Sequence, residues 1–137
     1  MDWNGTRTEE DKVLRFCNVV AFVPTLDAQR AKAFYADVLG LRLVSDDEFA
    51  LVFDAGGTTL RVVRVNELTP ARFTVLGWQV ENIDEMVAAL GQEGVQFEFY
   101  GFFEQDALGI WTAPTGDRVA WFKDPDGNTL SVSQHVL

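Results

Sequence analysis

The chain has 137 residues, of which 47% are apolar and 23% charged, so it can bury the core of one globular domain. Eleven Lys and Arg against twenty-one Asp and Glu give a formal net charge of −10, which repels a phosphate backbone and disfavours nucleic-acid binding. No apolar run approaches the roughly 20 residues that span a bilayer. A single cysteine, Cys17, excludes an intrachain disulfide and a thiolate cluster. We therefore expect a cytoplasmic domain whose partners are neither nucleic acids nor membranes.

The first half of the chain predicts one strand, one helix and three further strands. Residues 1–12 are polar and lack periodicity and an apolar signal core, so we expect a flexible tail. Residues 15–23 form a valine-rich run that predicts a buried strand. Asp27 then fits the N-cap of a helix that ends at a left-handed Gly40. Three short strands follow at 41–45, 49–53 and 58–65, the last two joined by a glycine turn.

The second half predicts the same succession of elements. Residues 73–80 form an apolar strand, and Asn82 with Glu85 predicts the capping box of a helix that ends at Gly94. Three further strands are expected at 95–99, 118–123 and 129–135.

The two halves form an internal repeat with two constant offsets. At an offset of 57, Val23, Leu26 and Asp27 match Val80, Ile83 and Asp84. At an offset of 70, Asp54, Gly57, Thr59 and Leu60 match Asp124, Gly127, Thr129 and Leu130. The difference of 13 residues predicts an insertion in the second half, between Tyr100 and Asp117. The sequence therefore predicts an α+β domain over 13–137, made of two β-α-β-β-β modules at 13–68 and 69–137.

Two stretches carry a resemblance to a known family. Residues 23–27 (VPTLD) with 32–41 (KAFYADVLGL), and residues 120–128 (AWFKDPDGN), resemble the opening strand and helix and the closing hairpin of the vicinal oxygen chelate superfamily. Glyoxalases, bleomycin-resistance proteins and extradiol dioxygenases belong to it. The resemblance covers roughly 13–135 and implies the glyoxalase/bleomycin-resistance fold, with two curled mixed sheets around a cleft and helices outside. It also implies a homodimer, and leaves open whether the cleft lies within one chain or between two.

The resemblance also implies four metal-ligand positions, which this sequence does not fill. Metal-using members typically place a His on the first strand and a Glu on the last strand of each module. Carried onto this chain, the positions fall on Asn18, Arg61, Val75 and Ser131. Valine has no donor atom and a guanidinium stays protonated. Because His135 is the only histidine, two-histidine centres are excluded within one chain. We expect no metal and no cofactor, although no spacing excludes a site made of carboxylates alone.

Alternation along the strands predicts which side chains share the cleft face. With the aromatic insertion included, the candidate ligand-binding residues are Asn18, Phe22, Arg61, Gln79, Phe102, Trp111, Ser131, Ser133 and His135. Each has an alternative role: Arg61 can pair with an acid instead of an anionic ligand, and His135 can be an exposed or packing residue. The polar residues among them can equally satisfy one another. The same alternation places Cys17 in the core.

The inserted segment is rich in aromatic residues, namely Tyr100, Phe102, Phe103 and Trp111. Such a loop either closes over a pocket or packs against the other module or a second subunit. Aromatic walls with carboxylates nearby suit a flat or cationic organic ligand.

Two functions from different classes follow. The first is metal-independent binding of a small organic molecule, aromatic or cationic, akin to the drug-sequestering members of the family. The alternative is an enzyme with an atypical site, either a lyase or isomerase of the glyoxalase type or a dioxygenase. No catalytic residue can be named, because one histidine near the C-terminus does not indicate a nucleophile–base–orienter triad. A module that only pairs with another copy is the third interpretation.

Overall fold

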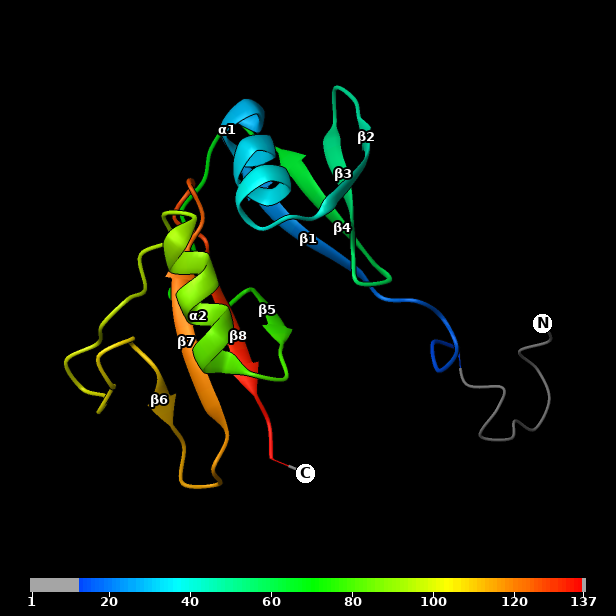
Figure 1. Cartoon of the computed structure of the whole chain (residues 1–137). Helices are drawn as coiled ribbons and strands as arrows, with labels where there is room; N and C mark the ends of the chain where they lie inside the picture. The colour runs from blue at the N-terminus through cyan, green and yellow to red at the C-terminus, as the bar shows by residue number, and fades with distance from the viewer. Residues whose placement is uncertain (1–12, 137) are drawn as a thin grey trace.

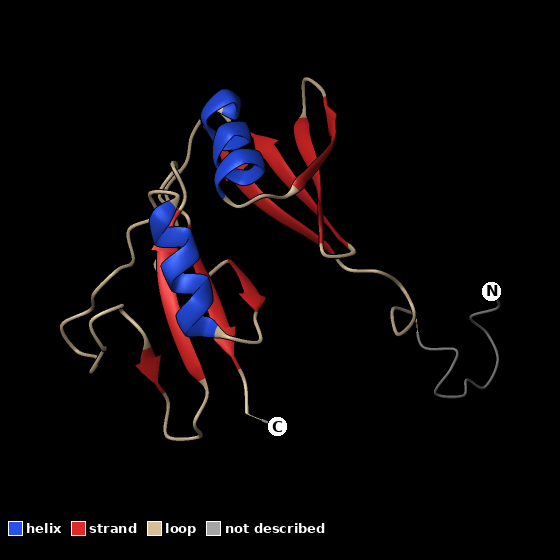
Figure 2. Cartoon of the chain, viewed as in Figure 1, coloured by secondary structure: helices blue, strands red, loops and turns tan. Residues whose placement is uncertain are grey.

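The computed structural model describes residues 13–136, and the predicted tail at 1–12 lies outside them. The first module contains β1 (Val20–Thr25), α1 (Ala28–Lys32), its π-helical continuation η2 (Ala33–Val38), β2 (Arg42–Asp46), β3 (Ala50–Ala55) and β4 (Thr58–Arg64). The second contains β5 (Leu76–Gln79), α2 (Ile83–Gln92), β6 (Trp111–Thr112), β7 (Arg118–Lys123) and β8 (Thr129–Gln134). Figures 1 and 2 show two sheets, each with a helix against one face. The predicted α+β architecture is confirmed.

The two sheets have the same topology. Their strand orders are β1-β4-β3-β2 and β5-β8-β7-β6, and the first and last strands of each module are parallel neighbours. Both helices begin at their predicted caps, where Asp27 and Asn82 each accept a hydrogen bond at 3.2 Å from the amide three residues on. Within residues 13–136 no helix is long and apolar enough to cross a membrane.

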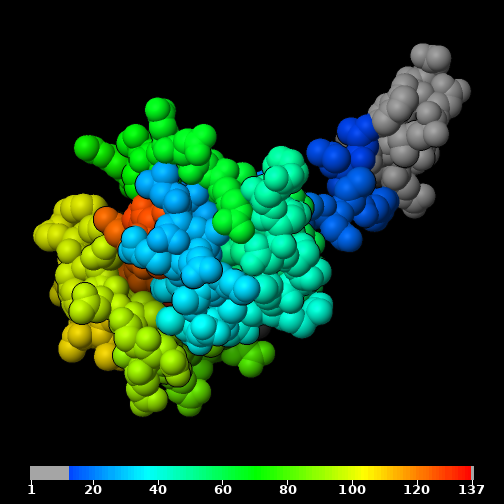
Figure 3. Space-filling model, turned by 90° about the horizontal axis from the view of Figure 1, so that it is seen from above, coloured from blue at the N-terminus to red at the C-terminus, as the bar shows by residue number. Residues whose placement is uncertain are grey.

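The first strand is shorter than the sequence predicts. It begins at Val20, whose partner on β4 is Thr59, and β4 itself begins only at Thr58. Because no strand is left to pair with residues 15–19, the chain before β1 forms a turn and projects from the body (Figure 3). The core position predicted for Cys17 is therefore wrong: its side chain is exposed and its Sγ lies 3.5 Å from the carbonyl oxygen of Val13.

The predicted insertion interrupts the edge strand of the second sheet. Phe97 makes an isolated bridge to Phe122 of β7, and the chain returns to β7 only at Trp111, which pairs with Val119. The strand predicted at 95–99 is thus reduced to a single bridge. After a long loop, β6 continues the edge of the sheet beside β7.

One core runs through both modules. It contains residues on the helix-facing side of each sheet together with the inner faces of α1, η2 and α2. Phe34 of η2 lies 6.4 Å from Phe122 of β7 between ring centroids, so the helix of one module contacts the sheet of the other. Burial of this shared apolar surface holds the two modules together.

The turn between β7 and β8 adds polar contacts across the same boundary. The hydroxyl of the fully buried Tyr35 donates to Oδ2 of Asp124 at 2.7 Å, and Asn128 donates to the carbonyl of Pro24 at 2.9 Å. Burial, with the charge of Asp124, raises the pKa of Tyr35 far above its ordinary value, so the phenol remains a donor. The aspartate-proline-aspartate-glycine-asparagine motif therefore fastens the modules to each other.

Asp126 of the same turn makes further hydrogen bonds between the modules, just before the first helix. Its carboxylate accepts from Thr25 Oγ1 at 2.6 Å and from the Leu26 amide at 2.8 Å. Thr25 is itself buried. The second module thereby fixes the junction of β1 and α1.

Candidate functional site

Each sheet has one face without a helix, which we call its open face. In the first module the open face carries Val20 and Phe22 of β1 beside Thr59 and Arg61 of β4. Phe22 is 59% exposed and Val20 is 43% exposed. The residues that alternate with them, such as Val62, are buried beneath the helix.

Arg61 lies between hydrophobic neighbours and near an acid. It pairs with Phe22 on one side and Val52 on the other, and it is half-buried. The pKa of Asp47 is held below its ordinary range mainly by amide hydrogen bonds from Ala50 and Phe49, with a smaller effect from the charge of Arg61. The guanidinium is thus balanced in part by an acid at the edge of the sheet.

The open face of the second module carries polar residues along β8. Ser131 and Ser133 lie opposite Gly77 and Gln79 of β5. Ser131 is buried because Gly77 leaves room for it: a β-carbon at Gly77 would come within 2.5 Å of Ser131 Oγ. Gln79 remains exposed.

The strand pairing corrects the internal repeat for the first strands. Leu60 and Leu130 are counterparts, and they pair with Ala21 and Leu76, which are 55 residues apart rather than 57. The offset of 57 came from matching Asp27 with Asp84. The observed N-caps of the two helices are Asp27 and Asn82, which are 55 residues apart and agree with the strand pairing. The counterpart of Val75 is therefore Val20.

Asn18 accordingly lies before β1 and not at the implied ligand position. The four positions become Val20, Arg61, Val75 and Ser131, and two of them have no donor atom. This set does not fit a divalent cation. Within residues 13–136 no three His, Cys, Asp or Glu side chains converge as a metal site would require.

Five aromatic side chains gather on the open face of β6 and β7. We call the set of Tyr100, Phe102, Phe103, Trp111 and Trp121 the aromatic cluster. The rings of Phe103 and Trp121 are stacked with centroids 5.3 Å apart, and Phe103 lies 4.7 Å from Trp111. Phe102 is 80% exposed. Trp121 is half-buried and lies on the same face of β7 as Val119, the partner of Trp111.

One amide side chain, that of Gln105, joins the two ends of the loop that carries three of these rings. Gln105 donates to the carbonyls of Glu98 and Gly109 at 2.9 and 2.8 Å and accepts from the amide of Tyr100 at 2.7 Å. These three bonds join the two ends of the loop. The aromatic rings are therefore presented by an ordered segment.

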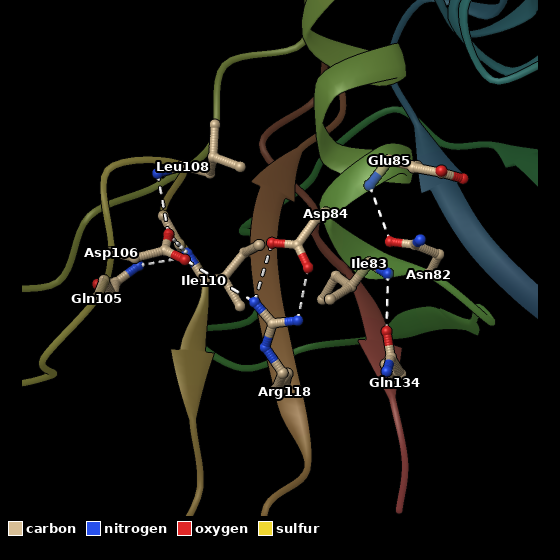
Figure 4. A network of polar contacts seen from close by, with 11 residues as sticks. Asn82, Ile83, Asp84, Glu85, Gln105, Asp106, Leu108, Ile110, Arg118 and Gln134 are labelled. Atoms are coloured by element: carbon tan, nitrogen blue, oxygen red, sulfur yellow. Dashed lines mark hydrogen bonds and ion pairs between the residues drawn. The ribbon is translucent and has the colours of Figure 1, made fainter.

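Ionic and polar contacts fasten the same loop to the helix side of the sheet (Figure 4). Asp106 accepts from the amides of Leu108 and Ile110 and lies 4.0 Å from Arg118. Arg118 in turn donates twice to Asp84 at the start of α2, at 2.7 and 3.0 Å. The hydrogen bond from Arg118 holds the pKa of Asp84 below its ordinary range.

His135 is not isolated at the end of β8. Its Nε2 lies 2.9 Å from Ser133 Oγ, and its Nδ1 lies 3.3 Å from Asp117 Oδ2. This arrangement could not be predicted from the sequence, because only the pairing of β7 with β8 brings Asp117 to His135.

An apolar hollow lies on the helix side of the second sheet, away from the aromatic cluster. It has a volume of about 270 Å³ and is lined by Leu39, Leu41, Trp78, Val80, Met86 and Leu90, among others. It therefore lies between η2 with its following turn and α2, on the helix side.

These observations describe a duplicated module with an aromatic open face, and the comparisons identify the family. A family model of the Glyoxalase/Bleomycin resistance protein/Dioxygenase superfamily matches residues 17–132. The chain belongs to this superfamily. No curated protein sequence matches it.

Solved structures of other superfamily proteins share the fold. A bleomycin-binding protein complexed with bleomycin is 22% identical, with 87% of this chain and 98% of that chain covered and a TM-score of 0.69. A lactoylglutathione lyase from Agrobacterium tumefaciens is 19% identical, with 86% and 93% covered and a TM-score of 0.66. A fosfomycin resistance protein from Listeria monocytogenes is 13% identical, with 87% and 93% covered and a TM-score of 0.67. At these identities the likeness shows the fold.

Proposed function

We propose that this superfamily member binds a small aromatic molecule, neutral or cationic, without a metal and against the aromatic cluster. The observation that carries the proposal is the place of the cluster, on the open face of the sheet whose implied ligand positions are Val75 and Ser131. Two of the four implied metal-ligand positions are valines, Val20 and Val75, and the aromatic cluster provides a surface on which a ligand can stack.

The geometry of the cluster suits a flat ligand. Phe103 and Trp121 are parallel within 3°, whereas Tyr100 stands nearly edge-on to Trp121. A planar molecule can stack on the exposed Phe102 side and meet ring edges at its rim. Aromatic faces and a net charge of −10 both favour a cation over an anion. The fold shared with a bleomycin-binding protein supports a drug-like ligand of this kind.

The second part of the proposal is a homodimer that completes the binding cleft. Phe22 and Val20 leave a large apolar area of the first open face exposed, and the second open face exposes Phe102 and Gln79. An open face of one chain laid against the complementary open face of a second copy would bury both. Arg61 would then lie across from the aromatic cluster, where it can orient a polar group of the ligand.

Isothermal titration calorimetry with defined probes tests the binding. The probes are bleomycin, the planar cation proflavine, and naphthalene derivatives that differ only in carrying an ammonium or a carboxylate group. We expect the ammonium form to bind more tightly than the carboxylate, and Trp111→Ala and Phe103→Ala each to weaken binding about 10-fold or more. Phe49→Ala, at an exposed aromatic residue of the β2–β3 turn, is the matched control. Absence of binding by every probe would overturn the proposal.

Elemental analysis of the purified protein tests the metal-independent part. We expect less than stoichiometric zinc, nickel, iron and manganese, and ligand binding that is unchanged after dialysis against a chelator. A stoichiometric metal whose removal abolishes ligand binding would refute metal independence and favour the enzymes of the superfamily.

A further inference from the structure

Three side chains that meet near the end of β8 contact one another in the order of a hydrolytic triad. Ser133 lies on β8 and His135 follows directly after its last residue, Gln134, with Ser133 Oγ 2.9 Å from His135 Nε2. Asp117 immediately precedes the pair Arg118–Gln134, so it faces His135 across the ladder and its Oδ2 lies 3.3 Å from Nδ1. Nucleophile, base and carboxylate thus contact one another through the two nitrogens that acyl-transfer triads use.

The carboxylate of this arrangement is fixed independently of the histidine. Its other oxygen, Oδ1, accepts a hydrogen bond from the amide of Val136 at 2.9 Å. That bond first, and the neighbouring His135 next, hold the pKa of Asp117 below its ordinary range, so the group is ionised at neutral pH. An ionised Asp117 favours the tautomer of His135 that carries its proton on Nδ1, which leaves Nε2 free to accept from the Ser133 hydroxyl.

The surroundings of Ser133 point to the class of substrate. Its cross-strand neighbours are Gln79 on β5 and Val119 on β7, and Val119 pairs with Trp111 of the aromatic cluster. An aromatic group held by the cluster therefore lies on the same face as the nucleophile. The exposed amide of Gln79 is a hydrogen-bond donor opposite Ser133, suited to the oxygen of a carbonyl group.

We propose that Ser133, His135 and Asp117 form an acyl-transfer site that hydrolyses small uncharged or cationic aromatic esters. The Ser133 oxygen forms a bond to the ester carbonyl carbon as its proton passes to Nε2 of His135. The carbon–oxygen bond to the alcohol breaks, and His135 returns the proton to the departing alcohol. Water then attacks the acyl-serine with His135 again as base, which releases the carboxylic acid and restores the serine. Asp117 stays ionised throughout and acts as a positioning residue.

This activity goes beyond the proposed binding function, on the same open face. It needs the nucleophile and its base, whereas the binding function needs the aromatic cluster. The two therefore fail separately. Binding of aromatic cations without reaction at Ser133 overturns the hydrolase alone, and reaction at Ser133 without binding of any aromatic probe overturns the binding function alone.

Two assays on the full-length protein test the site. In the first, 4-nitrophenyl benzoate and 4-nitrophenyl acetate are hydrolysed, and we expect an initial burst of 4-nitrophenol and a higher kcat/KM for the benzoate. In the second, a fluorophosphonate probe forms a bond to Ser133 with loss of fluoride. Intact mass and peptide mapping locate the adduct. An adduct at another residue, or none, overturns the proposal.

Variants assign the roles of the three residues. We expect Ser133→Ala and His135→Gln to lower kcat about 100-fold or more, and Ser133→Cys to keep the burst. Asp117→Asn should lower kcat and the labelling rate at Ser133 while leaving KM within about 2-fold, a division that a merely structural role would not give. Ser45→Ala on β2 is the matched control, and thermal melts check that each variant is folded. Unchanged turnover in Ser133→Ala overturns the proposal.

Discussion

At the scale of single residues, Asp124 shows how one buried carboxylate can join two modules. Its Oδ1 accepts from the amides of Asp126 and Asn128, and its Oδ2 accepts from Tyr35 and from the Asn128 side chain. A charged acceptor removed from water needs such a set of donors, because an unpaired buried charge is costly. The turn motif that contains Asp124 can be recognised in the sequence, but its hydrogen bond with Tyr35, 89 residues earlier, cannot.

Tyr35→Phe tests the bond between the modules. The variant keeps the ring and removes one donor to the buried carboxylate, so we expect the free energy of unfolding to fall by about 1 to 2 kcal/mol. Asp124→Asn should be worse, by about 3 kcal/mol, since its amide NH₂ turns a donor toward the donors of Tyr35 and Asn128. Urea denaturation at pH 7 measures both, with Tyr100→Phe as control. Equal stability of Tyr35→Phe and the wild type would show that the bond contributes nothing.

The lowered pKa of Asp84 leads us to expect a specific dependence of stability on pH. The hydrogen bond from Arg118 holds the pKa of Asp84 below its ordinary value in the folded state. A lowered folded-state pKa stabilises the protein above the unfolded pKa of about 4, and this contribution is lost as pH falls through the lower, folded value. Asp84→Asn should therefore flatten the decline of stability over that acidic range. Thermal midpoints between pH 7 and pH 2 check this, with Asp37→Asn as control. Parallel curves for the two proteins would contradict it.

At the scale of elements, predictions that depend on neighbouring residues are confirmed, whereas a prediction that depends on pairing between distant strands is wrong. The caps Asp27 and Asn82 are predictable because the bond that each makes spans three residues. The alternating residues 95–99 predict a strand for equally local reasons, yet only Phe97 bridges to β7. Whether such a run joins a sheet depends on its partner strand, and the inserted loop takes the chain away from it.

The loop between Glu98 and Trp111 depends on Gln105. Replacing Gln105 by alanine removes two donors and one acceptor that join the loop ends, so we expect amide hydrogen exchange over residues 99–110 to become about 10-fold faster or more. Affinity for proflavine should fall with it, because the rings of the aromatic cluster lose their fixed arrangement. Gln96→Ala, at an exposed amide near the same loop, is the control. Unchanged exchange in Gln105→Ala would show that packing of the rings alone orders the loop.

At the scale of the whole molecule, the shared core lies on the helix sides and leaves both open faces exposed. The fold follows from apolar patterning and the repeat, which a single sequence records. The site follows less completely, because Arg61 and the aromatic cluster lie on different modules and would meet across two chains in the dimer that we propose. What the sequence could not supply is therefore the assembly.

Mixing two variants that each lack wild-type ligand binding tests that assembly. In a dimer whose clefts each combine the first module of one chain with the second module of the other, Phe22→Ala, which removes the exposed ring of the first open face, and Trp111→Ala both damage every cleft of their own homodimers. In a mixed dimer one cleft carries both changes and the other carries neither. If equal amounts are unfolded, mixed and refolded, half of the dimers are mixed, so about a quarter of the wild-type number of sites should bind proflavine at wild-type affinity. Titration calorimetry gives that number, and each variant refolded alone is the control. Recovery of no wild-type sites would place each cleft within one chain, because mixing then leaves every cleft with the change its own chain carries.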